Sequence, residues 1–104
     1  MIQIALVGET PQVVEEGIRK NVPEKLYILH TKNESRYKFQ DKAKILKRKI
    51  VSDYQIPTEL VMVGAYDTDD VINKILNIIS KERKQSKSLE RSDFAINITG
   101  GTKA

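Results

Sequence analysis

The residues best suited to chemistry lie at positions 99–103, where the sequence reads Thr-Gly-Gly-Thr-Lys directly after the apolar segment 94–98. Two glycines allow a backbone to approach a ligand closely or to adopt positive φ angles. Two hydroxyl groups and an ammonium suit an oxyanion, and N–H groups at a following helix N-terminus would add donors. The stretch therefore indicates a phosphate-binding loop. An ordinary strand-to-helix turn is the alternative, and the sequence leaves it open.

A second unusual loop, Gly-Glu-Thr-Pro-Gln at residues 8–12, follows the apolar segment 2–7. It lacks the G-x-G-x-x-G pattern of dinucleotide-binding loops, and residues 100–103 lack the order and spacing of a P-loop. Nicotinamide and ordinary nucleoside triphosphate sites are therefore disfavoured. The sequence does not argue against phosphate binding in general.

This chain has few residues of the types that act as nucleophiles or metal ligands. There is no cysteine, and the single histidine, His30, is expected to be a surface or core residue. Neither a Ser-His-Asp triad nor a metal cluster can be assembled, and no metal or cofactor is expected. Glu15 and Glu16 are expected to cover the exposed face of the first helix, and Asn97 can satisfy a neighbouring backbone group.

Four strand-length apolar segments must position these loops. They span residues 2–7, 26–29, 60–63 and 94–98 and are mostly apolar on both faces, as in a sheet covered by helices on both sides.

Three helical stretches alternate with these segments. The first can begin at Thr10 or Pro11, and one of its faces carries Val13, Val14, Gly17 and Ile18. The second is indicated by the spacing of Phe39, Ala43, Leu46 and Ile50. The third follows the capping residues 67–70. Residues 84–92 are expected to form a polar loop. Such alternation predicts a doubly wound, Rossmann-like α/β domain with a parallel sheet of strand order 3-2-1-4 and helices on both faces. The ligand crevice of such a sheet opens beyond strands 1 and 4, where the two unusual loops begin.

Composition fits a single globular domain of 104 residues, with 39% hydrophobic and 31% charged residues. No apolar run approaches the roughly 20 residues of a membrane helix, and the N-terminus has no signal-peptide pattern. The absence of cysteine favours the cytoplasm. The net charge of +4 is concentrated in residues 32–49, which form either a solvated helix face or a nucleic-acid contact.

With both loops in view, the chain resembles the CARF family, the CRISPR-associated Rossmann-fold sensor domains of antiviral defence. Residues 8–16 are similar to the family's G-x-[ST]-P-x-x-V-x-E loop and helix. Residues 97–103 are similar to its [DN]-x-[ST]-x-x-x-[KR] motif in the common TGGTK form. The expected architecture is similar over the whole chain, whereas the amino-acid types are similar only in these two loops. Glu9 departs from the pattern, since the family usually has a small hydroxyl residue there.

The resemblance implies a homodimer that binds cyclic tetra- or hexa-adenylate in a groove across its two-fold axis. One wall would be formed by Gly8, Glu9, Thr10, Pro11 and Gln12, and the other by Asn97, Thr99, Gly100, Gly101, Thr102 and Lys103. Residues 1–104 would be one sensor domain, the N-terminal part of a longer protein with a nuclease or helix-turn-helix effector domain.

Two further functions remain open at this stage. Some family members cleave the cyclic messenger, by attack of a ribose 2′-hydroxyl on its own phosphate without a metal. Lys103 and Thr99 would then be the catalytic candidates. The other reading is a transcriptional regulator whose basic helix, residues 36–49, contacts a nucleic-acid backbone.

Overall fold

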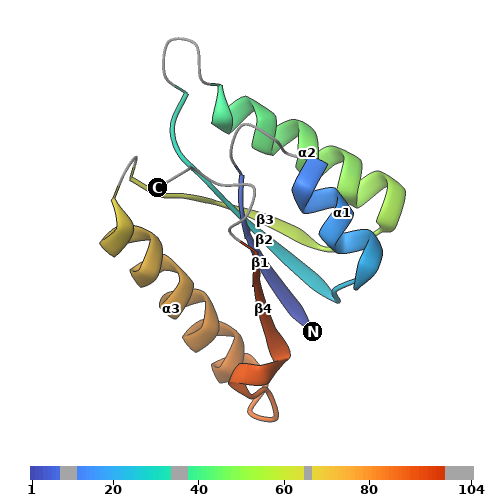
Figure 1. The fold of residues 1–104 in the computed structure, drawn as a ribbon. Helices are drawn as coiled ribbons and strands as arrows, with labels where there is room; N and C mark the ends of the chain where they lie inside the picture. Colours follow the sequence, from blue (N-terminus) through green and yellow to red (C-terminus); the bar gives the residue numbers. More distant parts are fainter. Residues whose placement is uncertain (8–11, 34–37, 65–66, 98–104) are drawn as a thin grey trace.

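The computed structural model describes residues 1–7, 12–33, 38–64 and 67–97 (Figure 1). Four strands alternate with three helices, and a short 3₁₀ turn, η1, precedes the last strand. In chain order the elements are β1 (Ile2–Leu6), α1 (Gln12–Lys20), β2 (Lys25–His30), α2 (Phe39–Tyr54), β3 (Thr58–Met62), α3 (Thr68–Gln85), η1 (Arg91–Asp93) and β4 (Phe94–Asn97).

The strands form one parallel sheet of order β3-β2-β1-β4, which confirms the predicted Rossmann-like α/β architecture. β1 lies between β2 and β4, and its Ala5 pairs with Ile28 on one side and Asn97 on the other. The carboxyl ends of β1 and β4 are therefore neighbours at the point where the strand order reverses.

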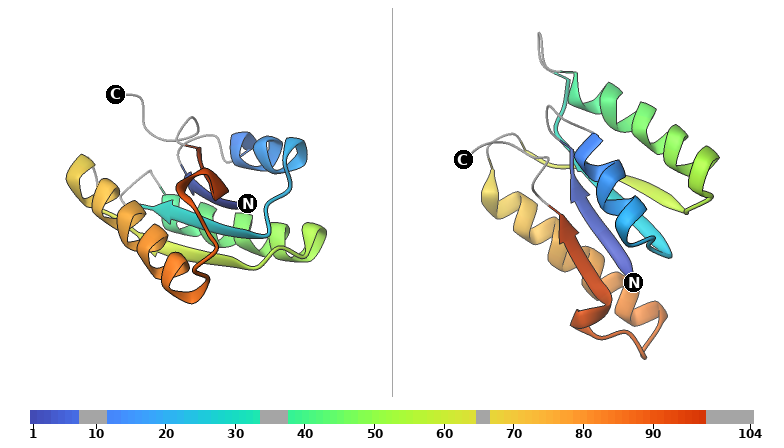
Figure 2. Two further views of the ribbon diagram at one scale, coloured as in Figure 1. Left: turned by 90° about the horizontal axis from the view of Figure 1, so that it is seen from below. Right: turned by 45° about the vertical axis from the view of Figure 1, so that its right-hand side comes forward.

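Helices cover both faces of the sheet: α1 and α2 lie on one face and α3 on the other (Figure 2). Each strand alternates between the two cores, because successive side chains of a strand point to opposite faces. The α1–α2 core contains Ala5, Val7, Val14, Ile18, Leu26, Ile28, Ala43, Leu46, Ile50 and Ile56. The α3 core contains Ile2, Ile4, Tyr27, Leu29, Val63 and Ile78.

Helix α2 follows the spacing that its sequence predicted. Ala43, Leu46 and Ile50 are buried against the sheet, because positions four and three residues apart lie on one side of a helix. The helix ends at Gln55, which adopts a left-handed conformation with φ of 56° and donates its N–H to the carbonyl of Val51. This is the geometry with which many helices terminate.

Helix α3 begins as expected and ends later than expected. The Asp67 carboxylate accepts a hydrogen bond from the Asp70 N–H at 3.0 Å, which is an N-terminal cap. The predicted polar loop at 84–92 is wrong at both ends, because α3 continues to Gln85 and η1 begins at Arg91. The last turns of α3 are held against the sheet by the buried side chain of Glu82, a tertiary contact that local composition does not reveal.

We expect Asp67→Ala to lower the free energy of unfolding by about 1 kcal/mol, because the Asp70 N–H loses the Asp67 carboxylate as its acceptor. Urea denaturation measures the loss. Asp67→Asn is the matched control, since its amide oxygen can still accept the hydrogen bond, and it should retain most of the stability. Equal destabilisation by both substitutions would show that charge, not capping, matters at this position.

Candidate ligand-binding site

The topology gives the candidate site its location. In doubly wound sheets, ligands bind beyond the carboxyl ends of the strands where the order reverses. Here those ends are Leu6 and Asn97, on adjacent strands. Most of the predicted site residues lie outside the described residues, namely Gly8, Glu9, Thr10, Pro11, Thr99, Gly100, Gly101, Thr102 and Lys103. Gln12 and Asn97 are described.

Gln12 is the first residue of α1, and its side chain is exposed. It borders a small cavity of about 210 Å³ between α1 and α2, together with Lys42 and Lys49. An exposed amide at the start of a helix can donate to or accept from a ligand without breaking an internal contact. The position of Gln12 is therefore compatible with the predicted binding role.

Asn97 is the last residue of β4 and lies against α1. A Cβ atom added to Gly17 of α1 would lie 3.1 Å from Nδ2 of Asn97 and 3.5 Å from Nε2 of Gln3. Glycine at position 17 therefore lets α1 approach the sheet over two amide side chains, of which Gln3 is buried. The sequence placed Gly17 on the inner face of the helix but did not reveal this close approach. Asn97 is thus held at the contact between β4 and α1.

Glu15 corrects one expectation, because it is buried rather than on the exposed face of α1; Glu16 is exposed as expected. The Glu15 carboxylate lies 3.1 Å from Nζ of Lys49 on α2 and 3.5 Å from the guanidinium of Arg19. Two cations compensate the cost of burying the charge. The pairing with Lys49 links α1 to α2 beside the cavity that Gln12 borders.

His30 is buried at the end of β2, with Nδ1 3.1 Å from the carbonyl oxygen of Thr31. Of the two places that the sequence left open for His30, surface or core, the structure shows the core. Within the described ranges, no three His, Cys, Asp or Glu side chains come together as metal ligands.

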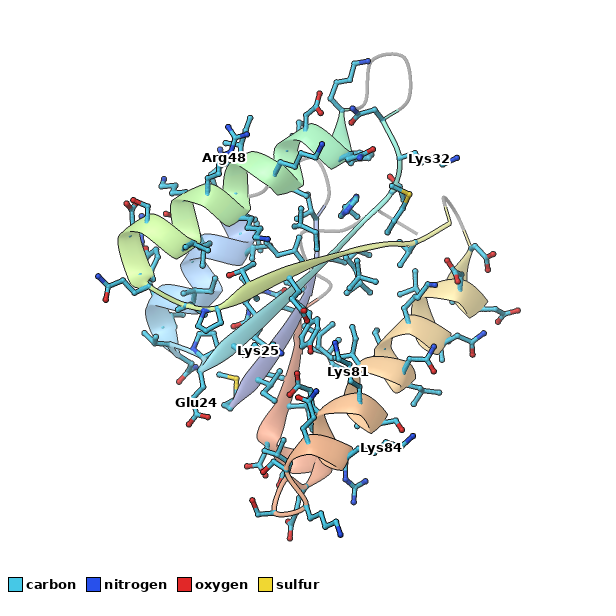
Figure 3. All side chains as sticks on the ribbon, turned by 180° about the vertical axis from the view of Figure 1, so that it is seen from behind. Glu24, Lys25, Lys32, Arg48, Lys81 and Lys84 are labelled. Carbon is cyan, nitrogen blue, oxygen red and sulfur yellow. The ribbon has the colours of Figure 1, made fainter. Side chains whose placement is uncertain are left out.

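A cluster of charged side chains between the sheet and α3 was not predicted. Nζ of Lys25 lies 2.7 Å from Oε1 of Glu82 and 3.7 Å from Oε2 of Glu59, and Lys81 lies 3.8 Å from the same Glu59 oxygen. The hydroxyl of Tyr27 also donates to Glu82. Figure 3 shows Lys25 and Lys81 on the side of the sheet that α3 covers. These residues lie up to 57 positions apart in the sequence, so no local sequence pattern predicts that they form a cluster.

The cluster shifts the pKa values of three of its members. Burial would raise the pKa of Glu82, but the hydrogen bonds from Lys25 and Tyr27 outweigh it, and the pKa is lowered. Burial and the hydrogen bond to Glu82 raise the pKa of Tyr27. The hydrogen bond to Glu82 raises the pKa of Lys25, against the opposing effect of burial.

These shifts predict a loss of stability at alkaline pH. In the unfolded chain, tyrosine and lysine release their protons at a pH of about 10, whereas folded Tyr27 and Lys25 retain them. The unfolded state then binds fewer protons than the folded state, so the free energy of unfolding falls as pH rises above about 10. Denaturation experiments at several pH values between 8 and 11 measure this decline in the free energy of unfolding. Tyr27→Phe should flatten the decline, and an unchanged slope would contradict the role of Tyr27.

The basic helix predicted at 36–49 begins in the structure only at Phe39, the first residue of α2; Lys38 precedes the helix, and residues 36–37 lie outside the described residues. The cations of α2 have different surroundings. Lys44 and Arg48 are exposed, whereas Lys49 pairs with Glu15, and Lys42 lies over the ring of Phe39 at 5.5 Å from its centre. Part of the positive charge is thus used within the chain, which reduces what is available to a nucleic-acid backbone.

No family model, curated protein or solved structure matches this chain. Among the described residues, no helix is both long and apolar enough to cross a membrane.

Proposed function

We propose that this chain is a CARF-type sensor domain that binds a cyclic oligoadenylate, the tetra- or hexa-adenylate ring, and passes a change of shape to an effector. The ligand would lie in a groove shared by two copies of the chain, in the cytoplasm. A nuclease or helix-turn-helix domain would be the effector.

One observation carries the proposal. β1 and β4 are adjacent and parallel, with Ala5 paired to Asn97, so the two motifs follow neighbouring strand ends in the chain. Motifs separated by about ninety residues of sequence are difficult to bring to one site in most topologies. The strand order 3-2-1-4 makes the strands that precede the two motifs neighbours, which supports a shared site.

The chemistry of the two motifs suits the ligand. A cyclic oligoadenylate presents a ring of phosphodiesters, for which the backbone amides of Gly100 and Gly101, the Thr102 hydroxyl and the Lys103 ammonium are appropriate donors. Its adenines need slots with polar edges, which Gln12 and Asn97 can supply. Asn97 would reach the ligand from a position already fixed by its contact with α1.

Isothermal titration calorimetry with cyclic tetra-adenylate and cyclic hexa-adenylate tests the proposal. We expect binding at micromolar concentration or tighter, with one ring for each two chains. Linear tetra-adenylate is the control, because it has the same bases and similar charge but not the closed ring, and it should bind more weakly. Absence of heat with both rings would refute the proposal.

The same sample addresses cleavage. After prolonged incubation with protein in excess, intact ring recovered by chromatography identifies a sensor, whereas linear fragments identify a ring nuclease. Duplex DNA of arbitrary sequence is the remaining comparison: steeply salt-dependent binding to DNA, without binding to either ring, would favour the nucleic-acid function of α2.

A further inference from the structure

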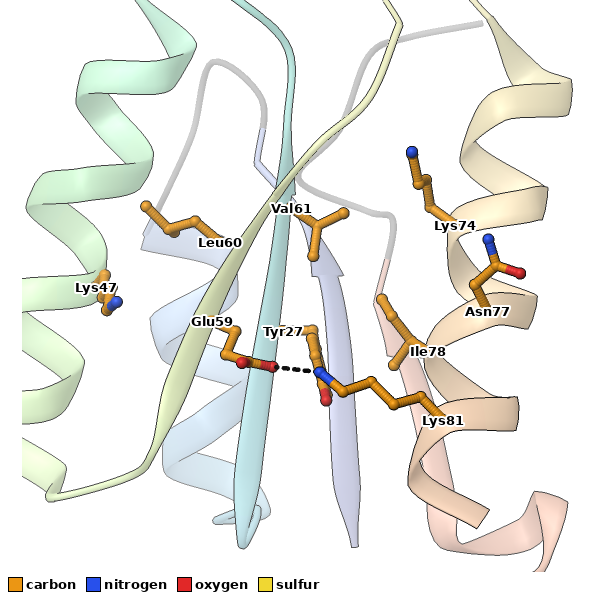
Figure 4. Close-up of a pocket in the computed structure, with 9 residues that line it drawn as sticks. All are labelled: Tyr27, Lys47, Glu59, Leu60, Val61, Lys74, Asn77, Ile78 and Lys81. Carbon is orange, nitrogen blue, oxygen red and sulfur yellow. Dashed lines mark ion pairs between the residues drawn. The ribbon is translucent and has the colours of Figure 1, made fainter. Parts of the chain in front are cut away.

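An open cleft of about 510 Å³ lies along the outer edge of the sheet, away from the carboxyl ends of β1 and β4. β3 forms its floor, α3 one wall, and Lys47 of α2 reaches it from the other face of the sheet (Figure 4). The cleft therefore includes both faces of one strand. A cavity that surrounds a strand edge in this way is shaped for an extended chain more than for a compact molecule.

The edge of β3 has free backbone groups in the described part of the chain. β3 is the terminal strand of the sheet, and the Pro57 carbonyl and the Val63 N–H are bonded to β2. Backbone groups alternate in direction along a strand, so those of Thr58, Leu60 and Met62 point away from β2. Such a row of donors and acceptors is a template for one more strand.

The side chains around this edge are mainly basic and apolar. Lys47 lies on the α2 side, and Lys74 and Lys81 lie on the α3 side, against the single carboxylate of Glu59. Lys81 pairs with Glu59 at 3.8 Å, whereas Lys47 and Lys74 take part in no ion pair within the described ranges. Leu60 packs toward the α1–α2 core and Val61 toward the α3 core, so each face also offers an apolar surface.

From this arrangement we propose that the β3 edge binds an acidic segment of a partner protein, which adds to the sheet as a fifth strand. Its alternate side chains would point toward Lys47 on one face and toward Lys74 and Lys81 on the other, so acidic residues can be accommodated on both sides. A second copy of this chain is disfavoured as the occupant, because pairing two β3 edges would bring two sets of lysines together. The site is independent of the cyclic oligoadenylate proposal.

The test uses an acetylated and amidated octapeptide of the repeat Glu-Glu-Val-Val, which places glutamates on both faces of an extended strand, titrated into the ¹⁵N-labelled chain. We expect the amide signals of Thr58, Leu60 and Met62 to shift and the affinity to fall with salt. The double variant Lys47→Glu/Lys74→Glu should weaken binding by about tenfold or more, since two favourable charge pairs become repulsive. Lys84→Glu makes the same change at an exposed α3 position that does not line the cleft, and it should bind the peptide normally.

A backbone variant separates strand addition from simple charge attraction. The N–H of Met62 points away from β2, so Met62→Pro should leave the β2–β3 pairing intact while blocking the added strand, with the fold checked by circular dichroism. Unimpaired peptide binding by Met62→Pro would overturn the proposal. So would shifts confined to the β4 edge, equal binding of a lysine–valine peptide, or self-association through β3 without peptide.

Discussion

Lys103→Ala is expected to weaken the binding of cyclic oligoadenylate by roughly two to four powers of ten. In the proposed binding mode, the substitution would remove a charge-assisted contact to phosphate, and such a contact typically contributes about 1.5–3 kcal/mol. A ring bound across a two-fold axis meets this lysine twice, so the two losses combine if they are additive. Stability is expected to change little, because the proposed partner of Lys103 is the ligand and not another part of the chain. Calorimetric titration of wild type and variant gives the ratio of affinities.

Lys20→Ala is the matched control, because Lys20 is an exposed lysine in the last turn of α1, at the opposite end of that helix from Gln12. It should bind the ring as wild type does. Loss of binding by Lys20→Ala with none by Lys103→Ala would mean that the ligand lies elsewhere. If neither substitution changes binding, residues 99–103 do not bind the ligand and are only a turn between secondary-structure elements.

Glu82→Ala is expected to lower the free energy of unfolding by about 2–4 kcal/mol. The substitution leaves the buried hydroxyl of Tyr27 without its acceptor and the Lys25 ammonium without its closest partner. The loss could lie in the lower part of this range if water replaces Glu82 as a partner of Lys25, because the Lys25 side chain is 27% exposed. Guanidinium denaturation at neutral pH measures the change.

Glu59→Ala is the comparison within the same cluster. The Glu59 side chain is 47% exposed, and its carboxylate lies 3.7 and 3.8 Å from the Nζ atoms of two lysines, which is the geometry of a surface ion pair. Its removal should cost no more than about 1 kcal/mol. If both substitutions cost the same, the buried hydrogen bonds of Glu82 do not hold α3 to the sheet.

The fold was accessible from the sequence because each element carries its own local signal. Branched apolar runs marked the strands, the spacing of Ala43, Leu46 and Ile50 marked α2, and Asp67 marked the start of α3. The strand order was then taken from the doubly wound pattern that strand–helix alternation with right-handed crossovers favours, and this pattern does not depend on individual side chains. The errors fell at element ends, where Glu82 holds the last turns of α3 to the sheet.

The candidate site was only partly accessible. The sequence could say which loops begin at adjacent strand ends, and the sheet bears out that adjacency. It could not say that Glu15 is buried between Arg19 and Lys49, or that Gly17 brings α1 onto Asn97. The contacts of Glu15 with Lys49 and of Gly17 with Asn97 join residues distant in sequence. Glu15 and Arg19 lie four positions apart on α1, a spacing that allows an ion pair but does not reveal that the carboxylate is buried.

Nuclear magnetic resonance mapping of cyclic tetra-adenylate on the ¹⁵N-labelled chain tests the location of the ligand most directly. Backbone and side-chain amide signals of Gln12 and Asn97, and the backbone amides of residues 8–10 and 98–103, should shift together with the ligand concentration. Signals of the β3 edge and of the exposed α2 residues Lys44 and Arg48 should stay in place. Shifts confined to β3 or α2, with residues 8–12 and 97–103 unmoved, would contradict a ligand site at the carboxyl ends of β1 and β4.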